Sequence, residues 1–180
     1  MLENDIQEVL YSEDQIKRRV AELGAEIERD YAGKEVELIG ILRGSFVFMA
    51  DLCRHINLPC TLDFMAVSSY GSGTSSSGQV QINKDLSEDI SGRHLIIVED
   101  ILDSGNTLSY LMELLRHRNP ASLKICTLLN KSERRVRPVK ADYIGFEVPD
   151  AFVVGYGMDY NEKYRNLPYV GALKPEVYSH

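Results

Sequence analysis

Residues 94–107 constrain the fold of this chain more than any other segment. They read His-Leu-Ile-Ile-Val-Glu-Asp-Ile-Leu-Asp-Ser-Gly-Asn-Thr, an apolar run followed by carboxylates and then by small polar residues. The run at 95–98 has the length and β-branched content of a buried strand, and the apolar-periodic segment from Thr107 predicts a helix. A strand-to-helix turn of small polar residues directs backbone N–H groups and the positive end of a helix toward one point, which suits a phosphate.

The carboxylates in this turn indicate what else the ligand carries. Glu99, Asp100 and Asp103 cannot bind a phosphate directly, because like charges repel. Beside a phosphate they can accept hydrogen bonds from sugar hydroxyls or hold Mg²⁺ through oxygen ligands. The turn therefore predicts a phosphorylated sugar. The alternative is a strand followed by a helix whose cap is acidic.

Residues 98–107 resemble the phosphoribosyl pyrophosphate (PRPP) motif of the type I phosphoribosyltransferases. In that family four hydrophobic residues precede two acidic ones, and a Thr/Ser-Gly-x-Thr phosphate loop follows. The resemblance covers most of the chain and is nearest to the 6-oxopurine enzymes, the hypoxanthine(-guanine) phosphoribosyltransferases. It implies an α/β fold with a central, mostly parallel sheet flanked by helices, a small hood and a mobile lid loop.

The resemblance also assigns roles within the motif. Glu99 and Asp100 accept from the ribose hydroxyls and orient Mg²⁺, and Asp103 is the general base for the purine N7 proton. The 5′-phosphate goes to Ser104, Gly105, Asn106 and Thr107.

Size and composition bound the remaining possibilities. The 180 residues predict one domain, 1–180, and an apolar fraction of 44% is enough for a sizeable core. A net charge of −7 disfavours nucleic acid as a partner. No apolar run approaches the roughly 20 residues that span a bilayer, and the first residues lack a signal peptide. Three cysteines without metal-ligand spacing indicate reduced, mostly buried thiols and a cytoplasmic protein.

Helical and strand patterns alternate along the chain. Ser12 opens a capping box before a helix that continues to about Arg29. A second helix is expected at 46–55, and a third runs from about Thr107 until Asn119-Pro120 ends it. Strands are expected at 35–42, 60–70, 79–84, 95–98, 122–129 and 141–146. Such alternation predicts ligands at the carboxyl ends of the strands.

Two further loops carry candidate ligand contacts. Arg43 and Gly44 follow a strand, where glycine lets backbone N–H groups approach an anion and arginine adds charge. The resemblance makes this the pyrophosphate loop, with an unusual cis peptide, and a lysine is common where Arg43 stands. The Gly/Ser segment 71–78 after Ser69-Tyr70 corresponds to the family's lid, which excludes water from the site. Without the resemblance, the first loop is a tight turn with a solvated arginine, and the second is a plain hairpin tip.

The second substrate is indicated by residues from 131 onward. Lys131 corresponds to the lysine that binds the purine 6-oxo group, Phe152 to the aromatic residue that stacks on the base, and Val153 to a backbone contact. By the same resemblance Asp159 supports a second Mg²⁺ and the base end of the site, and Arg165 contacts pyrophosphate. Taken alone, Lys131 reads as a solvated charge and Phe152 as a core residue.

The expected reaction is transfer of the phosphoribosyl group from Mg-PRPP to N9 of hypoxanthine, and also of guanine, giving IMP or GMP and pyrophosphate. Two alternatives stay open: a PRPP-sensing regulator that binds RNA or DNA, and a transferase that prefers xanthine or guanine. Family members form dimers or tetramers, so a homo-oligomer is expected.

Overall fold

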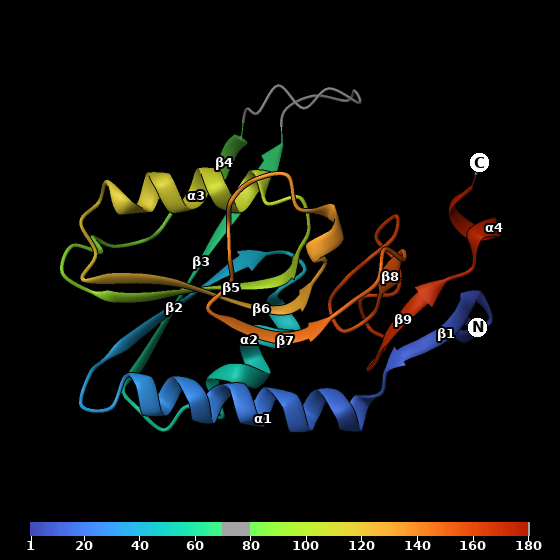
Figure 1. The fold of residues 1–180 in the computed structure, drawn as a ribbon, viewed down its shortest axis with the longest axis horizontal. Helices are drawn as coiled ribbons and strands as arrows, with labels where there is room; N and C mark the ends of the chain where they lie inside the picture. Colours follow the sequence, from blue (N-terminus) through green and yellow to red (C-terminus); the bar gives the residue numbers. More distant parts are fainter. Residues whose placement is uncertain (70–79, 180) are drawn as a thin grey trace.

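A six-stranded sheet forms the centre of the protein. In the computed structural model, which describes residues 1–69 and 80–179, the strand order is β4-β3-β2-β5-β6-β7 (Figure 1). The strands are β2 (Val36–Leu42), β3 (Cys60–Ser69), β4 (Val80–Lys84), β5 (His94–Leu102), β6 (Ser122–Asn130) and β7 (Tyr143–Glu147). Only the β3–β4 pair of this sheet is antiparallel. The prediction of a mostly parallel α/β sheet is confirmed.

Helices cover both faces of this sheet. α1 (Glu13–Asp30) and α2 (Phe46–Cys53) lie on one face, and α3 (Asn106–Arg116) lies on the other (Figure 1). Along β5, Ile96 and Val98 belong to the apolar cluster of α1 and α2, whereas Leu95 and Ile97 belong to that of α3. A strand covered on both faces needs apolar residues at every position, which explains the unbroken run at 95–98.

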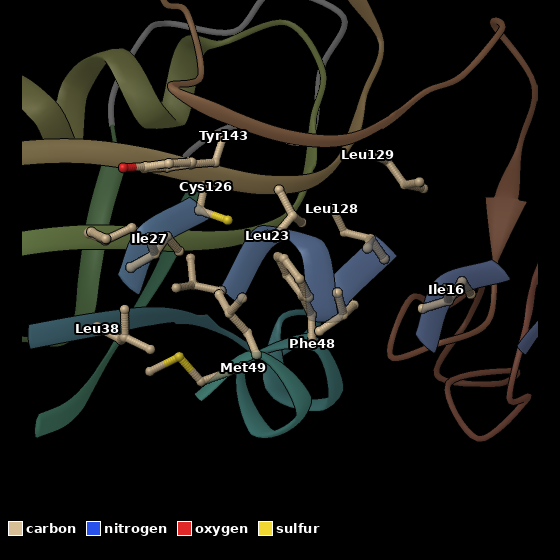
Figure 2. Close-up of a cluster of buried hydrophobic side chains, with 14 of the residues drawn as sticks. Ile16, Leu23, Ile27, Leu38, Phe48, Met49, Cys126, Leu128, Leu129 and Tyr143 are labelled. Carbon is tan, nitrogen blue, oxygen red and sulfur yellow. The ribbon is translucent and has the colours of Figure 1, made fainter. Parts of the chain in front are cut away.

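The long helix α1 provides much of the larger cluster. Its predicted capping box forms, with Ser12 Oγ accepting from the Gln15 backbone N–H and the Gln15 side chain accepting from that of Ser12. Figure 2 shows Leu23 and Ile27 among side chains from α2, β2 and β6. Burying a side chain of this size contributes roughly 1.5–3 kcal/mol, so this face fixes α1 firmly under the sheet.

A second, three-stranded antiparallel sheet was not predicted strand by strand. It consists of β1 (Ile6–Tyr11), β9 (Val170–Leu173) and β8 (Val153–Val154), and α4 (Pro175–Tyr178) follows it. These four elements, here called the hood, lie beyond the carboxyl ends of β5 and β6 (Figure 1). β1 and β9 are short, and they pair although most of the chain separates them in sequence. No local pattern in the sequence could therefore reveal them.

Several smaller expectations need correction. The helix expected at 46–55 ends at Cys53, because His55 closes a turn by donating to the Leu52 carbonyl. The strand expected at 141–146 is displaced toward Glu147. The three cysteines are free, but only Cys126 is fully buried. Among the described residues, no helix has the length and apolar content needed to cross a membrane.

Candidate active site

The site lies at the point in the central sheet where the order in which strands are added changes side. From β2 the chain continues to β3 on one side, while β5 pairs with β2 on the other side. The loops that follow β2 and β5 therefore separate above neighbouring strands. Ligands of open α/β sheets bind in the crevice that such a divergence creates.

The loop after β5 leads into the N-terminus of α3. Gly105 is the N-cap of α3 and has φ 87°, a left-handed conformation that costs other residues more than glycine. The Ser104 hydroxyl accepts from the Asn106 N–H at 3.3 Å, and the first N–H groups of α3 have no partner within the helix. This geometry can bind a phosphate, as the sequence predicted.

A polar cavity of about 810 Å³ opens beside this loop. Its walls include Ser104, Gly105 and Thr107 and four carboxylates, those of Glu99, Asp103, Asp159 and Glu162. Burial, and next the charge of Asp100, raise the pKa of Glu99 well above its usual range. So many carboxylates repel a polyanion unless a cation accompanies it.

The Arg43–Gly44 loop reaches the same region from β2. Leu42 and Arg43 are joined by a cis peptide, as the family resemblance implied. A methyl group on Gly44 would overlap Asp100 Oδ2, so only glycine lets the loop come this close to the carboxylate. Asp100 is held in turn by the Ile101 N–H, which donates to Oδ1 at 2.7 Å.

Arg43 and Arg165, the two predicted pyrophosphate contacts, are brought together by Glu162. The Glu162 carboxylate lies 2.7 Å from the Arg43 guanidinium and 3.5 Å from that of Arg165. Arg165 also donates to the Gly157 carbonyl at 2.7 Å and lies 3.4 Å from Asp159. Glu162 was not predicted as a site residue, although it lies between the predicted residues Asp159 and Arg165.

A smaller cavity of about 240 Å³ shares part of its lining with the first. Both cavities have Ile101, Asp103 and Asp159 in their walls. Lys131 from the end of β6 is only 8% exposed, while Phe152 before β8 is 37% exposed. The full lining is Asp100, Ile101, Asp103, Lys131, Phe152, Val153, Met158 and Asp159. All four predicted purine contacts therefore surround one small cavity.

Arg135 anchors the phosphate loop from below and was missed by the sequence reasoning. Its guanidinium donates to the carbonyls of Asp103 at 3.0 Å, Val139 at 2.7 Å and Leu102 at 3.4 Å, and to the Asn130 side chain. The Val136 N–H adds a bond to the Ser104 carbonyl at 2.9 Å. The sequence gives no sign that one of the arginines in the basic stretch 134–137 points inward.

Four predicted residues of the described part of the chain line neither cavity, namely Arg43, Gly44, Asn106 and Arg165. The Asn106 side chain accepts from Arg137 at 3.0 Å. The lid prediction falls on the side chain of Ser69, on Tyr70 and on the Gly/Ser segment, all outside the described part of the structure. The lid stays a prediction.

Comparison with known proteins identifies the family. The model of the phosphoribosyl transferase domain matches residues 7–161. The chain belongs to this family. It is 56% identical to the hypoxanthine-guanine phosphoribosyltransferase of Bacillus subtilis over 178 residues, 99% of either chain.

Solved structures of phosphoribosyltransferases agree with the fold. A hypoxanthine phosphoribosyltransferase from Staphylococcus aureus superimposes with a TM-score of 0.97 at 51% identity, covering 99% of this chain and 97% of that one. A mutant of the Trypanosoma cruzi enzyme in a ternary complex with its substrates has a TM-score of 0.93 at 44% identity, covering 98% and 100%. The type I phosphoribosyltransferase fold and the likeness to hypoxanthine-guanine enzymes are confirmed.

Proposed function

We propose that this phosphoribosyltransferase transfers the 5-phosphoribosyl group from PRPP to N9 of hypoxanthine and guanine, giving IMP or GMP and pyrophosphate for purine salvage. One observation carries the proposal: the polar cavity at the phosphate loop and the small cavity with Lys131 and Phe152 share Asp103 and Asp159 as walls. Two substrates bound in these cavities would meet at these carboxylates.

PRPP would occupy the larger cavity. Its 5′-phosphate would bind the loop Ser104–Thr107, where backbone N–H groups and the start of α3 favour negative charge. Glu99 and Asp100 would accept from the ribose hydroxyls. Pyrophosphate would lie toward Arg43, Gly44 and Arg165, because a guanidinium binds phosphate oxygens in a bidentate manner. The Glu162 carboxylate that now bridges the two arginines would give way to it.

The purine would occupy the smaller cavity. Lys131 would donate to the 6-oxo group, Phe152 would stack on the ring and the Val153 backbone would contact the base edge. A buried donor at this position favours hypoxanthine or guanine, since the 6-amino group of adenine would leave it unpaired.

Asp103, which lines both cavities, would act as the general base. Its Oδ1 is buried and makes no hydrogen bond to any described residue, and its nearest cation there is Arg134 at 3.6 Å. An acceptor of this kind can take the N7 proton while N9 bonds to the ribose anomeric carbon and pyrophosphate departs. Neighbouring carboxylates would stabilise the positive charge that develops on the ribose.

Mg²⁺ fits the donor chemistry of the larger cavity. Carboxylate oxygens are its preferred protein ligands, and the crowded Glu99–Asp100 pair gains from a nearby cation. No set of three or more such side chains in the described residues is arranged to hold a metal alone. This agrees with Mg²⁺ bound by one or two carboxylates together with substrate phosphates. Glu99 and Asp100 would orient one Mg²⁺ and Asp159 would support a second, and the metal would neutralise the pyrophosphate.

The proposal extends to the state of the protein in the cell. A single domain over 1–180 would act in the cytoplasm as a homo-oligomer. Dimers and tetramers are both expected from the family, and we propose the homotetramer. Light scattering coupled to size exclusion would decide between the two assemblies.

Release of pyrophosphate tests the function directly. The protein is mixed with PRPP and Mg²⁺ and with hypoxanthine, guanine, xanthine or adenine in parallel. Turnover is expected with the first two, and no turnover with any base would refute the proposal. Asp103→Asn should lower kcat by at least about a hundredfold while PRPP still binds, because a general base contributes about 10²–10⁴-fold. Lys131→Met should raise KM for hypoxanthine and leave KM for PRPP nearly unchanged.

A further inference from the structure

The Phe152 ring is supported by two other aromatic residues, Tyr178 and Tyr160. Tyr178 of α4 stacks on it with a centroid separation of 4.9 Å and an interplanar angle of 22°. Tyr160 meets its edge at 5.3 Å and 90°. The walls of the small cavity include Phe152 but neither of these tyrosines. Tyr178 therefore backs the ring, and the other face of Phe152 is left for a ligand in the cavity.

Tyr178 is itself held in place by the hood. It packs against the apolar cluster of Val154, Tyr164, Leu167 and Leu173. The Lys174 N–H before α4 donates to the Asp5 carbonyl at 2.9 Å, and the Leu173 N–H donates to the Phe152 carbonyl at 2.9 Å. Figure 1 shows α4 directly after β9, next to β1. The backing ring thus belongs to a folded unit that also fixes the Phe152 backbone.

An aromatic side chain that stacks on a base binds better when its ring is already in the required plane, since less side-chain freedom is then lost on binding. Phe152 is 37% exposed, so the surrounding residues leave part of its side chain without packing contacts. The stack with Tyr178 restrains the ring.

We propose that Tyr178 is a positioning residue for the purine: it holds the Phe152 ring in the plane on which the base stacks, and so sets the affinity for base and nucleotide product without touching either. This rests on the proposed function, because it takes Phe152 as the stacking surface for the purine.

Three variants test this role. An aromatic pair is worth about a two- to tenfold change in an equilibrium constant, so Tyr178→Ala should raise KM for hypoxanthine by about that factor. KM for PRPP and kcat should stay within about twofold. Tyr178→Phe keeps the ring and should behave like the wild type. The control is Tyr110→Ala, which removes a 38% exposed tyrosine of α3 that borders neither cavity.

Calorimetric binding of IMP is measured in parallel with turnover. The affinity for IMP should fall by the same factor in Tyr178→Ala and in neither of the other variants. The role of Tyr178 is refuted by an unchanged KM for hypoxanthine, by an equal rise of both KM values, or by Tyr178→Phe behaving like Tyr178→Ala. If the wild type binds IMP but does not turn over, the proposed function fails alone, and the IMP affinities still decide the role of Tyr178. If the wild type does not bind IMP, both fail.

Discussion

Replacing Arg135 by alanine should release the phosphate loop from the sheet. The half-buried guanidinium donates at 3.0 Å to the Asp103 carbonyl and at 2.7 Å to that of Val139, and it also contacts the Asn130 side chain and the Leu102 carbonyl. A hydrogen bond with one charged partner contributes about 1.5–3 kcal/mol, and water can replace part of it at a half-buried site. The free energy of unfolding should therefore fall by about 2–4 kcal/mol.

The neighbouring Arg134 provides a matched control. It is also an arginine of the same stretch, but its side chain is 55% exposed and its ion pairs with Asp103 and Asp150 are 3.6 and 3.5 Å long. Exposed pairs of this kind contribute less than about 1 kcal/mol. Arg135→Lys should stay close to Arg135→Ala in stability, because an ammonium cannot reach several carbonyls in the planar arrangement of a guanidinium.

Urea denaturation measures the stability of these variants, and steady-state kinetics measures the consequence for the loop. KM for PRPP should rise at least about tenfold in Arg135→Ala, equivalent to about 1.4 kcal/mol, and KM for hypoxanthine should change less. Equal stability losses in Arg134→Ala and Arg135→Ala would refute the role assigned to Arg135 as the anchor of the phosphate loop. A large loss of stability with an unchanged KM for PRPP would show that the loop keeps its shape without Arg135.

Three further outcomes are expected. Gly44→Ala should lower kcat/KM for PRPP at least about tenfold without unfolding the protein, because the added methyl group overlaps Asp100 Oδ2; full activity would contradict this close approach. Burial raises the pKa of Glu37 and Arg93 opposes the shift, so the folded protein keeps that proton to higher pH than the unfolded chain. Stability should then fall as pH rises from the unfolded pKa of about 4.3 through the folded one. Urea denaturation should show that the free energy of unfolding of Glu37→Gln rises relative to that of the wild type over this pH range. If the two variants instead have parallel curves of stability against pH, a buried charge at Glu37 is contradicted. Chelation by EDTA should abolish pyrophosphate release, and added Mg²⁺ should restore it; turnover that persists in EDTA would remove the metal from the reaction.

The strand, turn and helix at 94–116 could be predicted because neighbouring residues determine them. An unbroken apolar run needs cover on both faces, Gly105 permits a left-handed N-cap, and the periodic apolar residues of α3 give it one buried face. The capping box of α1 formed for the same local reason. The resemblance extended this to the pyrophosphate loop and its cis peptide.

The hood and the contacts that it supplies could not be predicted in this way. β1 pairs with β9, and Phe152 stacks on Tyr178, only after the chain has folded back on itself. Local periodicity carries no information on such pairings. The same holds for Glu162 between two arginines, because Arg43, one of the two, lies 119 residues away in sequence.

The sequence by itself determined the family, the parallel sheet and the chemistry of the phosphate loop, because these depend on residues within one turn or one strand of each other. The tertiary structure alone decided that Arg135 turns inward beneath the loop and that Tyr178 backs Phe152. It also decided that two cavities share Asp103 and Asp159. The physical reason is that the direction of an arginine or an aromatic ring depends on which acceptors and apolar surfaces the fold brings next to it.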